Sequence, residues 1–159
     1  MDKAALLQSF LEELEATREL LVRSANAAHE EATHEESAAE NKYDTRGLEA
    51  SYLAGAQSRR IGELDQIIHL FESMKPRSFG EDDPITIGAV VEISDGEESQ
   101  WFFLAARAGG TKITFNNQMI SILTPQSPLG QQVMGAQLGD PVELRLRNKT
   151  IEYEILQCF

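Results

Sequence analysis

The sequence predicts an α+β protein in which an N-terminal antiparallel helical hairpin precedes a mainly antiparallel β domain that carries one short helix. Residues 1–75 contain no proline, which disrupts helix interiors, and all five prolines follow them. Apolar residues recur every three to four positions in the first half, as in a helix, and alternate in the second half, as in a strand. We therefore expect a coiled-coil hairpin at 1–75, a linker at 76–84 and a β domain at 85–159.

Two apolar stripes define the expected helices. They consist of Leu7, Leu11, Leu14 and Leu21, and of Ile61, Leu64, Ile68 and Phe71. If the chain reverses near residues 37–44, residue i faces position about 79 − i, so that large side chains meet at the root and alanines meet toward the tip. A partner stripe within the same chain favours a monomer. A structural adaptor whose helices pair with another chain is the alternative.

The C-terminal half shows the pattern of a small sheet. Short apolar or alternating runs are bounded by turn residues, which predicts strands. These strands are 85–93, 100–106, 119–123, 141–147 and 150–156, of which the last two form a hairpin. A short helix is expected at 129–134, between a Ser-Pro pair and Gly135.

Charge and composition exclude several classes of function. The chain has 14 basic and 26 acidic residues and a formal net charge of −12. Such a surface does not suit a nucleic acid or an anionic membrane, because affinity for phosphates comes mainly from Lys and Arg. Cys158 is the only cysteine, which excludes an internal disulfide and a Cys-rich zinc site. With no apolar run of about 20 residues and no secretory signal pattern, we expect a cytoplasmic protein.

The sequence motifs do not indicate catalysis by this chain itself. His29 and His34 resemble a zinc-protease pair, but that motif needs a spacing of four, and a spacing of five puts them on different faces of a helix. Cys158 has no paired histidine pattern, and phosphate-loop and serine-hydrolase motifs are absent. We expect no enzymatic activity of its own and no tightly bound cofactor.

The expected reversal of the hairpin is strongly acidic. Residues 30–44 hold six acids and one lysine, so their net charge is 1 − 6 = −5. Mg²⁺ prefers carboxylate oxygens as ligands, and an added carboxylate can complete a two-metal phosphoryl site that another protein supplies. The six acids of this stretch are therefore candidate functional groups, and a solvated face that only promotes solubility is the alternative.

The segment from Ser127 to Leu144 carries a more specific pattern. It reads Ser-Pro-Leu-Gly-Gln-Gln-Val-Met-Gly-Ala-Gln-Leu-Gly-Asp-Pro-Val-Glu-Leu, and it resembles the C-terminal domain of the Gre family of bacterial transcript-cleavage factors. Residues 85–91 and 119–123 are similar to that family's first strand and to the strand before its Ser-Pro turn. The resemblance covers residues 84–156. In the helical half it rests on architecture and on local matches such as Glu40-Asn41.

The resemblance implies a partner and a mode of action. A C-terminal domain of FKBP-like fold would dock at the rim of the secondary channel of RNA polymerase, and the coiled coil would enter that channel. Ser127 and Pro128 are the implied docking candidates, with Gln126 where the family often has Asp. RNA would be met only indirectly, inside the polymerase complex. An FKBP-like fold also raises prolyl isomerase activity as an alternative, which the lack of an aromatic residue in 129–134 disfavours.

At the tip, the family places an Asp and a Glu three residues apart, followed by Asn, and these acids help to hold a second Mg²⁺ in the polymerase active site. Glu40-Asn41 matches the Glu-Asn pair, but Ser37 occupies the position of the Asp. The resemblance thus implies transient contacts from Glu40, with Asp44 or Glu36, to an Mg²⁺ shared with the polymerase. Two mechanisms stay open, namely stimulated cleavage of backtracked RNA and occupation of the channel without cleavage.

Overall fold

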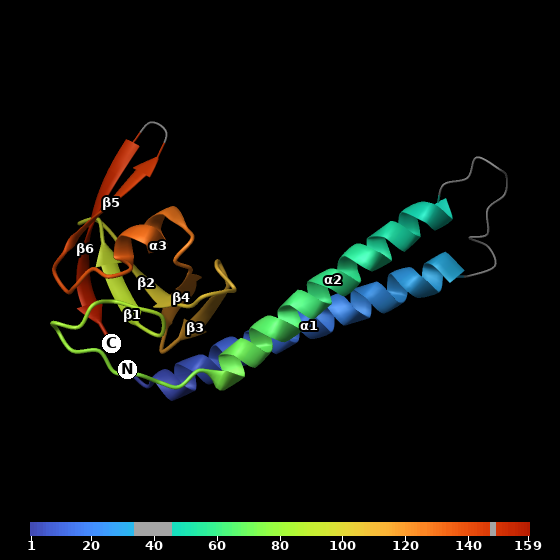
Figure 1. Ribbon diagram of the computed structural model, residues 1–159, viewed down its shortest axis with the longest axis horizontal. Helices are drawn as coiled ribbons and strands as arrows, with labels where there is room; N and C mark the ends of the chain where they lie inside the picture. The colour runs from blue at the N-terminus through green and yellow to red at the C-terminus, as the bar shows by residue number, and fades with distance from the viewer. Residues whose placement is uncertain (34–45, 147–148) are drawn as a thin grey trace. The chain divides into compact units, whose positions relative to one another are not determined.

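The computed structural model describes residues 1–33, 46–146 and 149–159 (Figure 1). The chain forms two compact units, one made of residues 1–10 and 73–159 and the other of Leu11–Glu72. The sequence assigned the whole of 1–75 to the hairpin. The structure differs because the first ten residues pack with the β domain.

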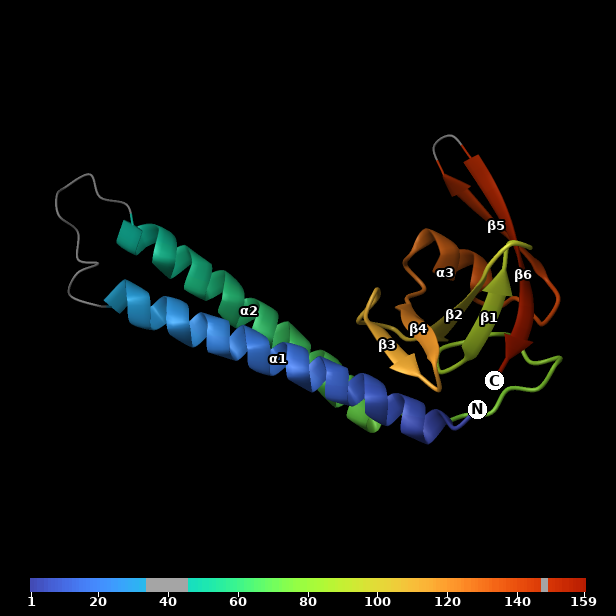
Figure 2. The same ribbon diagram turned by 180° about the vertical axis from the view of Figure 1, so that it is seen from behind.

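The helical unit consists of two long helices that run antiparallel, side by side (Figures 1 and 2). Helix α1 spans Lys3–Thr33 and helix α2 spans Arg46–Ser73, which confirms the predicted hairpin. Leu14, Leu64 and Ile68 are buried, as the two apolar stripes require. Within the described ranges, none of the helices is long and apolar enough to cross a membrane.

An ion pair reports the register of the two helices. Arg18 of α1 pairs with Asp65 of α2. The expected facing rule of 79 − i puts residue 61 opposite Arg18, so the observed partner is displaced by four residues. Four residues are close to one helical turn, and a shift of this size keeps the apolar stripes on facing sides.

The β domain contains a six-stranded sheet with the strand order β3-β4-β2-β1-β6-β5. The strands are β1 (Val90–Ser94), β2 (Ser99–Leu104), β3 (Lys112–Phe115), β4 (Gln118–Leu123), β5 (Pro141–Leu146) and β6 (Lys149–Cys158). Four neighbouring pairs are antiparallel, and β2 and β4 are parallel because the chain passes through the edge strand β3 between them. The mainly antiparallel sheet and its short helix, α3 (Pro128–Val133), are therefore confirmed.

Two details of the strand prediction need correction. The first strand begins at Val90 instead of residue 85, because the preceding segment turns at Gly88, whose φ is 92°, and the Ala89 N–H bonds to the Thr86 carbonyl. The edge strand β3 was not predicted. Its four residues, Lys-Ile-Thr-Phe, alternate between polar and apolar, but a run this short is the minimum from which a strand is inferred.

Each face of the sheet has its own apolar cover. One face packs with α3 around a core that includes Val91, Leu104, Val133, Tyr153 and Ile155. Strand register puts Val90 and Phe103 together on the other face, and both are buried. There Phe10 of α1, which is 0% exposed, stacks on Phe103 with 5.5 Å between ring centroids. This contact explains why residues 1–10 belong to the β unit.

Lys3 ties the start of α1 to the same unit. Its Nζ donates hydrogen bonds to the carbonyl oxygens of Arg77 and Gly88, the second at 2.8 Å, and lies 4.4 Å from the centre of the Phe79 ring. Burial lowers the pKa of Lys3 to about 8, while Cys158 opposes this shift and Arg77 adds to it.

Candidate docking surface

The Ser-Pro turn lies between β4 and α3 and is held by three hydrogen bonds. Ser127 caps α3, because its Oγ accepts a hydrogen bond from the N–H of Gly130 at 3.0 Å. The same Oγ donates to the carbonyl of Thr124 at 2.8 Å, and the Ser127 N–H donates to that carbonyl at 3.0 Å. Pro128 takes the first helical position, where the N–H that proline lacks would have no helical partner. These bonds define the shape of the turn.

The turn presents a neutral surface. Gln126 and Pro128 are exposed, whereas Ser127 is half-buried. The Nε2 of Gln131, a residue of α3, donates to the carbonyl of Gln126 at 3.3 Å and so supports the turn. Residues 124–132 include no charged side chain. A partner that docks here therefore meets shape and neutral hydrogen-bonding groups.

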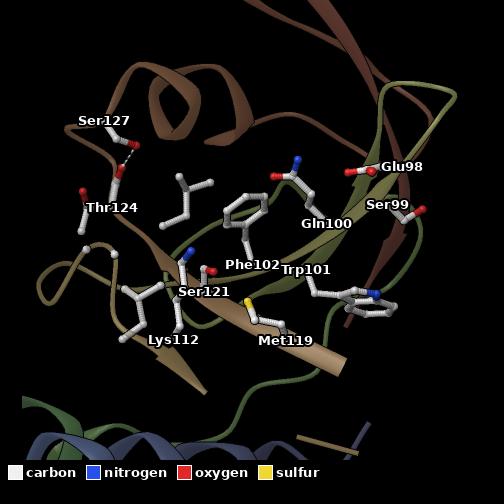
Figure 3. A pocket seen from close by; sticks show the side chains of 14 residues that line it. Glu98, Ser99, Gln100, Trp101, Phe102, Lys112, Met119, Ser121, Thr124 and Ser127 are labelled. Carbon is white, nitrogen blue, oxygen red and sulfur yellow. Dashed lines mark hydrogen bonds between the residues drawn. The ribbon is translucent and has the colours of Figure 1, made fainter. Parts of the chain in front are cut away.

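A pocket of about 770 Å³ opens beside the turn. Strands β2, β3 and β4 form its floor, and their register puts Phe102, Lys112 and Ser121 on one face of the sheet. Figure 3 shows Phe102 and Met119 over this floor, with Thr124 and Ser127 along one side. The turn and the pocket thus form one continuous surface.

The chemistry of the pocket suits binding. Phe102 and Met119 supply apolar surface, and Met119 is 62% exposed. Gln100 and Ser121 supply hydrogen-bonding groups, and Lys112 supplies a positive charge. The described residues that line the pocket include hydroxyl groups but neither histidine nor cysteine, so a hydroxyl nucleophile has no imidazole base beside it.

The region that holds the turn and the pocket matches a known protein family. Residues 80–158 match the family model described as transcription elongation factor, GreA/GreB, C-term. The chain belongs to the Gre family.

Solved structures similar to this Gre-family chain include two GreA homologues. GreA factor homolog 1 (Gfh1) of Thermus thermophilus is 18% identical, with 95% of each chain covered and a TM-score of 0.39. Gfh1 of Thermus aquaticus is 21% identical, with 95% of this chain and 94% of that chain covered and a TM-score of 0.40. No curated protein sequence matches the chain.

The candidate acids of the hairpin tip, Glu36, Glu40 and Asp44, lie outside the described residues. Their roles therefore stay predictions. In the described parts of the chain, no group of three or more His, Cys, Asp and Glu side chains is placed to hold a metal ion. The imidazole of His69 bonds to the carboxylate of Glu72 at 2.8 Å on an exposed helix face.

Sequence reasoning missed most of the pocket. Lys112, Ser121 and Phe102 come from three strands and face one another only through the sheet register. One of these strands, β3, was not predicted, and the parallel pairing of β2 with β4 has no local sequence signal. The available hint was Ser121, a polar residue between two buried isoleucines in an apolar strand.

Proposed function

We propose that this chain binds RNA polymerase as a transcription elongation regulator of the Gre type. The observation that carries the proposal is the match of residues 80–158 to the GreA/GreB C-terminal family model. In this proposal the coiled coil of α1 and α2 enters the secondary channel, and the turn at Ser127 and Pro128 docks at the channel rim. The neutral turn and the open pocket beside it support docking, because together they offer a partner both apolar surface and hydrogen-bonding groups.

The acidic tip would determine what the factor does inside the channel. Glu40, with Asp44 or Glu36, would contact an Mg²⁺ that the polymerase supplies, since carboxylate oxygens suit this ion. Because Ser37 stands where a second family carboxylate is expected, we favour occupation of the channel without cleavage. Stimulated RNA cleavage is the competing mechanism. In both mechanisms the chemistry belongs to the polymerase.

A backtracked elongation complex with 5′-labelled RNA separates the two mechanisms. Occupation predicts that the wild-type chain slows nucleotide addition without shortening the RNA. Glu40→Ala should reduce that effect by at least about tenfold while binding is kept, because the carboxylate near the metal is lost. Glu15→Ala, which removes an exposed acid from α1, is the matched control and should behave as the wild type.

The outcomes of this experiment are distinct. RNA that shortens with the wild-type chain, and stays long with Glu40→Ala, establishes cleavage in place of occupation. An equal effect of Glu40→Ala and Glu15→Ala contradicts a metal-directed role for the tip. A wild-type chain that does not bind the polymerase contradicts the proposed function as a whole.

The two alternative functions find less support. The Arg18–Asp65 ion pair joins the helices of one chain, which favours an intramolecular hairpin over an adaptor that pairs with another chain. A monomeric mass in solution is the expected result. Phe103 packs in the core against Phe10, and α3 contributes no aromatic side chain, so a proline-binding pocket of the isomerase type is disfavoured. A turnover assay with a proline peptide tests this directly.

A further inference from the structure

Gly130 stands at a position in α3 where a side chain does not fit. A Cβ atom at this residue would lie 1.9 Å from the carbonyl oxygen of Thr124 and 2.8 Å from the Oγ of Ser127, far closer than non-bonded atoms approach. The φ of Gly130 is not in the positive range, so glycine serves here to leave space. Glycine is unfavourable inside a helix, which indicates that this space is used.

Thr124 fills the space that Gly130 leaves. Its carbonyl oxygen accepts a hydrogen bond from the Oγ of Ser127 at 2.8 Å (Figure 3). The same carbonyl accepts from the Ser127 N–H at 3.0 Å, and the Ser127 Oγ accepts from the Gly130 N–H at 3.0 Å. On its other side Thr124 meets Gly109, where an added Cβ would lie 2.9 Å from the Thr124 Cγ2. Thr124 is therefore held between two glycines, and its position sets the start of the turn.

We propose that Gly130 is a positioning residue for docking: by leaving room for the Thr124 carbonyl, it sets where Ser127 and Pro128 meet the partner. This inference rests on the proposed docking function of the turn. A larger residue at position 130 must displace either Thr124 or the first turn of α3, and these carry the two ends of the turn. Because residues 124–132 carry no charged side chain, the turn itself contributes to docking through its shape and its neutral hydrogen-bonding groups.

Four single substitutions in the full chain test the proposal. Gly130→Ala introduces the clash. Ser127→Ala removes the Oγ without adding bulk, and Ser127→Thr keeps a hydroxyl that can cap the helix. Val133→Ala is the matched stability control, because Val133 is a buried residue of the same helix whose truncation leaves the turn unchanged. The affinity of each variant for RNA polymerase is measured by competition with the labelled wild-type chain, at a temperature below the Tm of every variant. The Tm values are measured by circular dichroism.

We expect Gly130→Ala to weaken binding by about tenfold or more and Ser127→Ala by about threefold, with Ser127→Thr close to the wild type. Val133→Ala should lower the Tm yet leave the affinity within about twofold. This pattern separates the position of the turn from the stability of the domain.

Three results overturn the proposal. The first is a folded Gly130→Ala chain that binds the polymerase as tightly as the wild type. The second is a Val133→Ala chain that has the same Tm as Gly130→Ala and loses as much affinity. If Gly130→Ala does not fold, the Ser127 variants decide, and Ser127→Ala with wild-type affinity is the third overturning result. A wild-type chain that does not bind the polymerase refutes the proposed function itself, and the inference falls with it.

Discussion

Lys3 is the only buried charged residue among those the structure describes, with 8% of its surface exposed. Two carbonyl oxygens and the face of the Phe79 ring replace part of the water that its ammonium group loses. Desolvation nevertheless remains the largest influence and lowers the pKa of Lys3 to about 8. The sequence did not reveal this burial, because lysine is usually exposed and the partners of Lys3, Arg77 and Gly88, are far along the chain.

The lowered pKa of Lys3 makes stability depend on pH in a defined window. The folded value is about 8 and the ordinary value, which applies to the unfolded chain, is 10.5. Below pH 8 the full cost of burying the charge is present. Between pH 8 and 10.5 the unfolded chain binds more protons, so the free energy of unfolding rises with pH, by at most about 3 kcal/mol from this group.

Substitution of Lys3 by methionine tests this window. Lys3→Met should flatten the rise in the free energy of unfolding between pH 8 and 10.5, as measured by urea unfolding at several pH values. Both chains in this comparison carry Cys158→Ser, so that they differ only at residue 3. Cys158 is replaced because burial raises the pKa of its thiol above 9.0, and its titration would overlap with that of Lys3. If the free energy of unfolding rises equally between pH 8 and 10.5 in both chains, the prediction is contradicted.

At the scale of the element, the spacing of apolar residues predicted whether a segment is a helix or a strand better than it predicted where that segment begins and ends. Helix α3 and strand β4 lie close to where apolar runs and the Ser-Pro pair placed them. The strand expected from residue 85 begins only at Val90, because the backbone turns at Gly88. The helix of residues 3–33 has one continuous period, so its sequence does not show that the first turns pack on a sheet.

The first turns of α1 should stabilise the β domain directly. Phe10 is fully buried and stacks on Phe103 of β2. Phe10→Ala should lower the free energy of unfolding by about 3 kcal/mol, because it leaves a cavity against the sheet. Denaturant unfolding followed by the fluorescence of Trp101, the only tryptophan and a residue of β2, measures the domain concerned.

A matched control keeps that result interpretable. Leu20 lies on the same helix and is 69% exposed, so Leu20→Ala should change the free energy of unfolding by no more than about 0.5 kcal/mol. If both variants lower stability equally, α1 acts through its own helical stability and not through the contact between Phe10 and Phe103.

At the scale of the whole molecule, the β unit is discontinuous in sequence, since it joins residues 1–10 to 73–159. Leu7 and Leu14 belong to one predicted stripe, yet they fall in different units. Periodicity reports that a helix has an apolar side, but not which partner covers each turn of it. The docking pair Ser127 and Pro128 could be proposed because a local motif carries it, whereas the pocket beside it depends on strand register.

The discontinuity of the β unit predicts how the chain tolerates division. A fragment of residues 76–159 lacks the cover that Phe10 gives to Phe103, so a buried face of the sheet becomes exposed to water. We expect this fragment to bind a hydrophobic dye such as ANS and to unfold at a lower temperature than residues 73–159 joined to residues 1–10 by a Gly/Ser linker. The same linked protein with Phe10→Ala serves as the control and should resemble the shorter fragment. Fragment 76–159 unfolding cooperatively at the temperature of the linked protein, without binding dye, would show that the sheet needs no cover from α1.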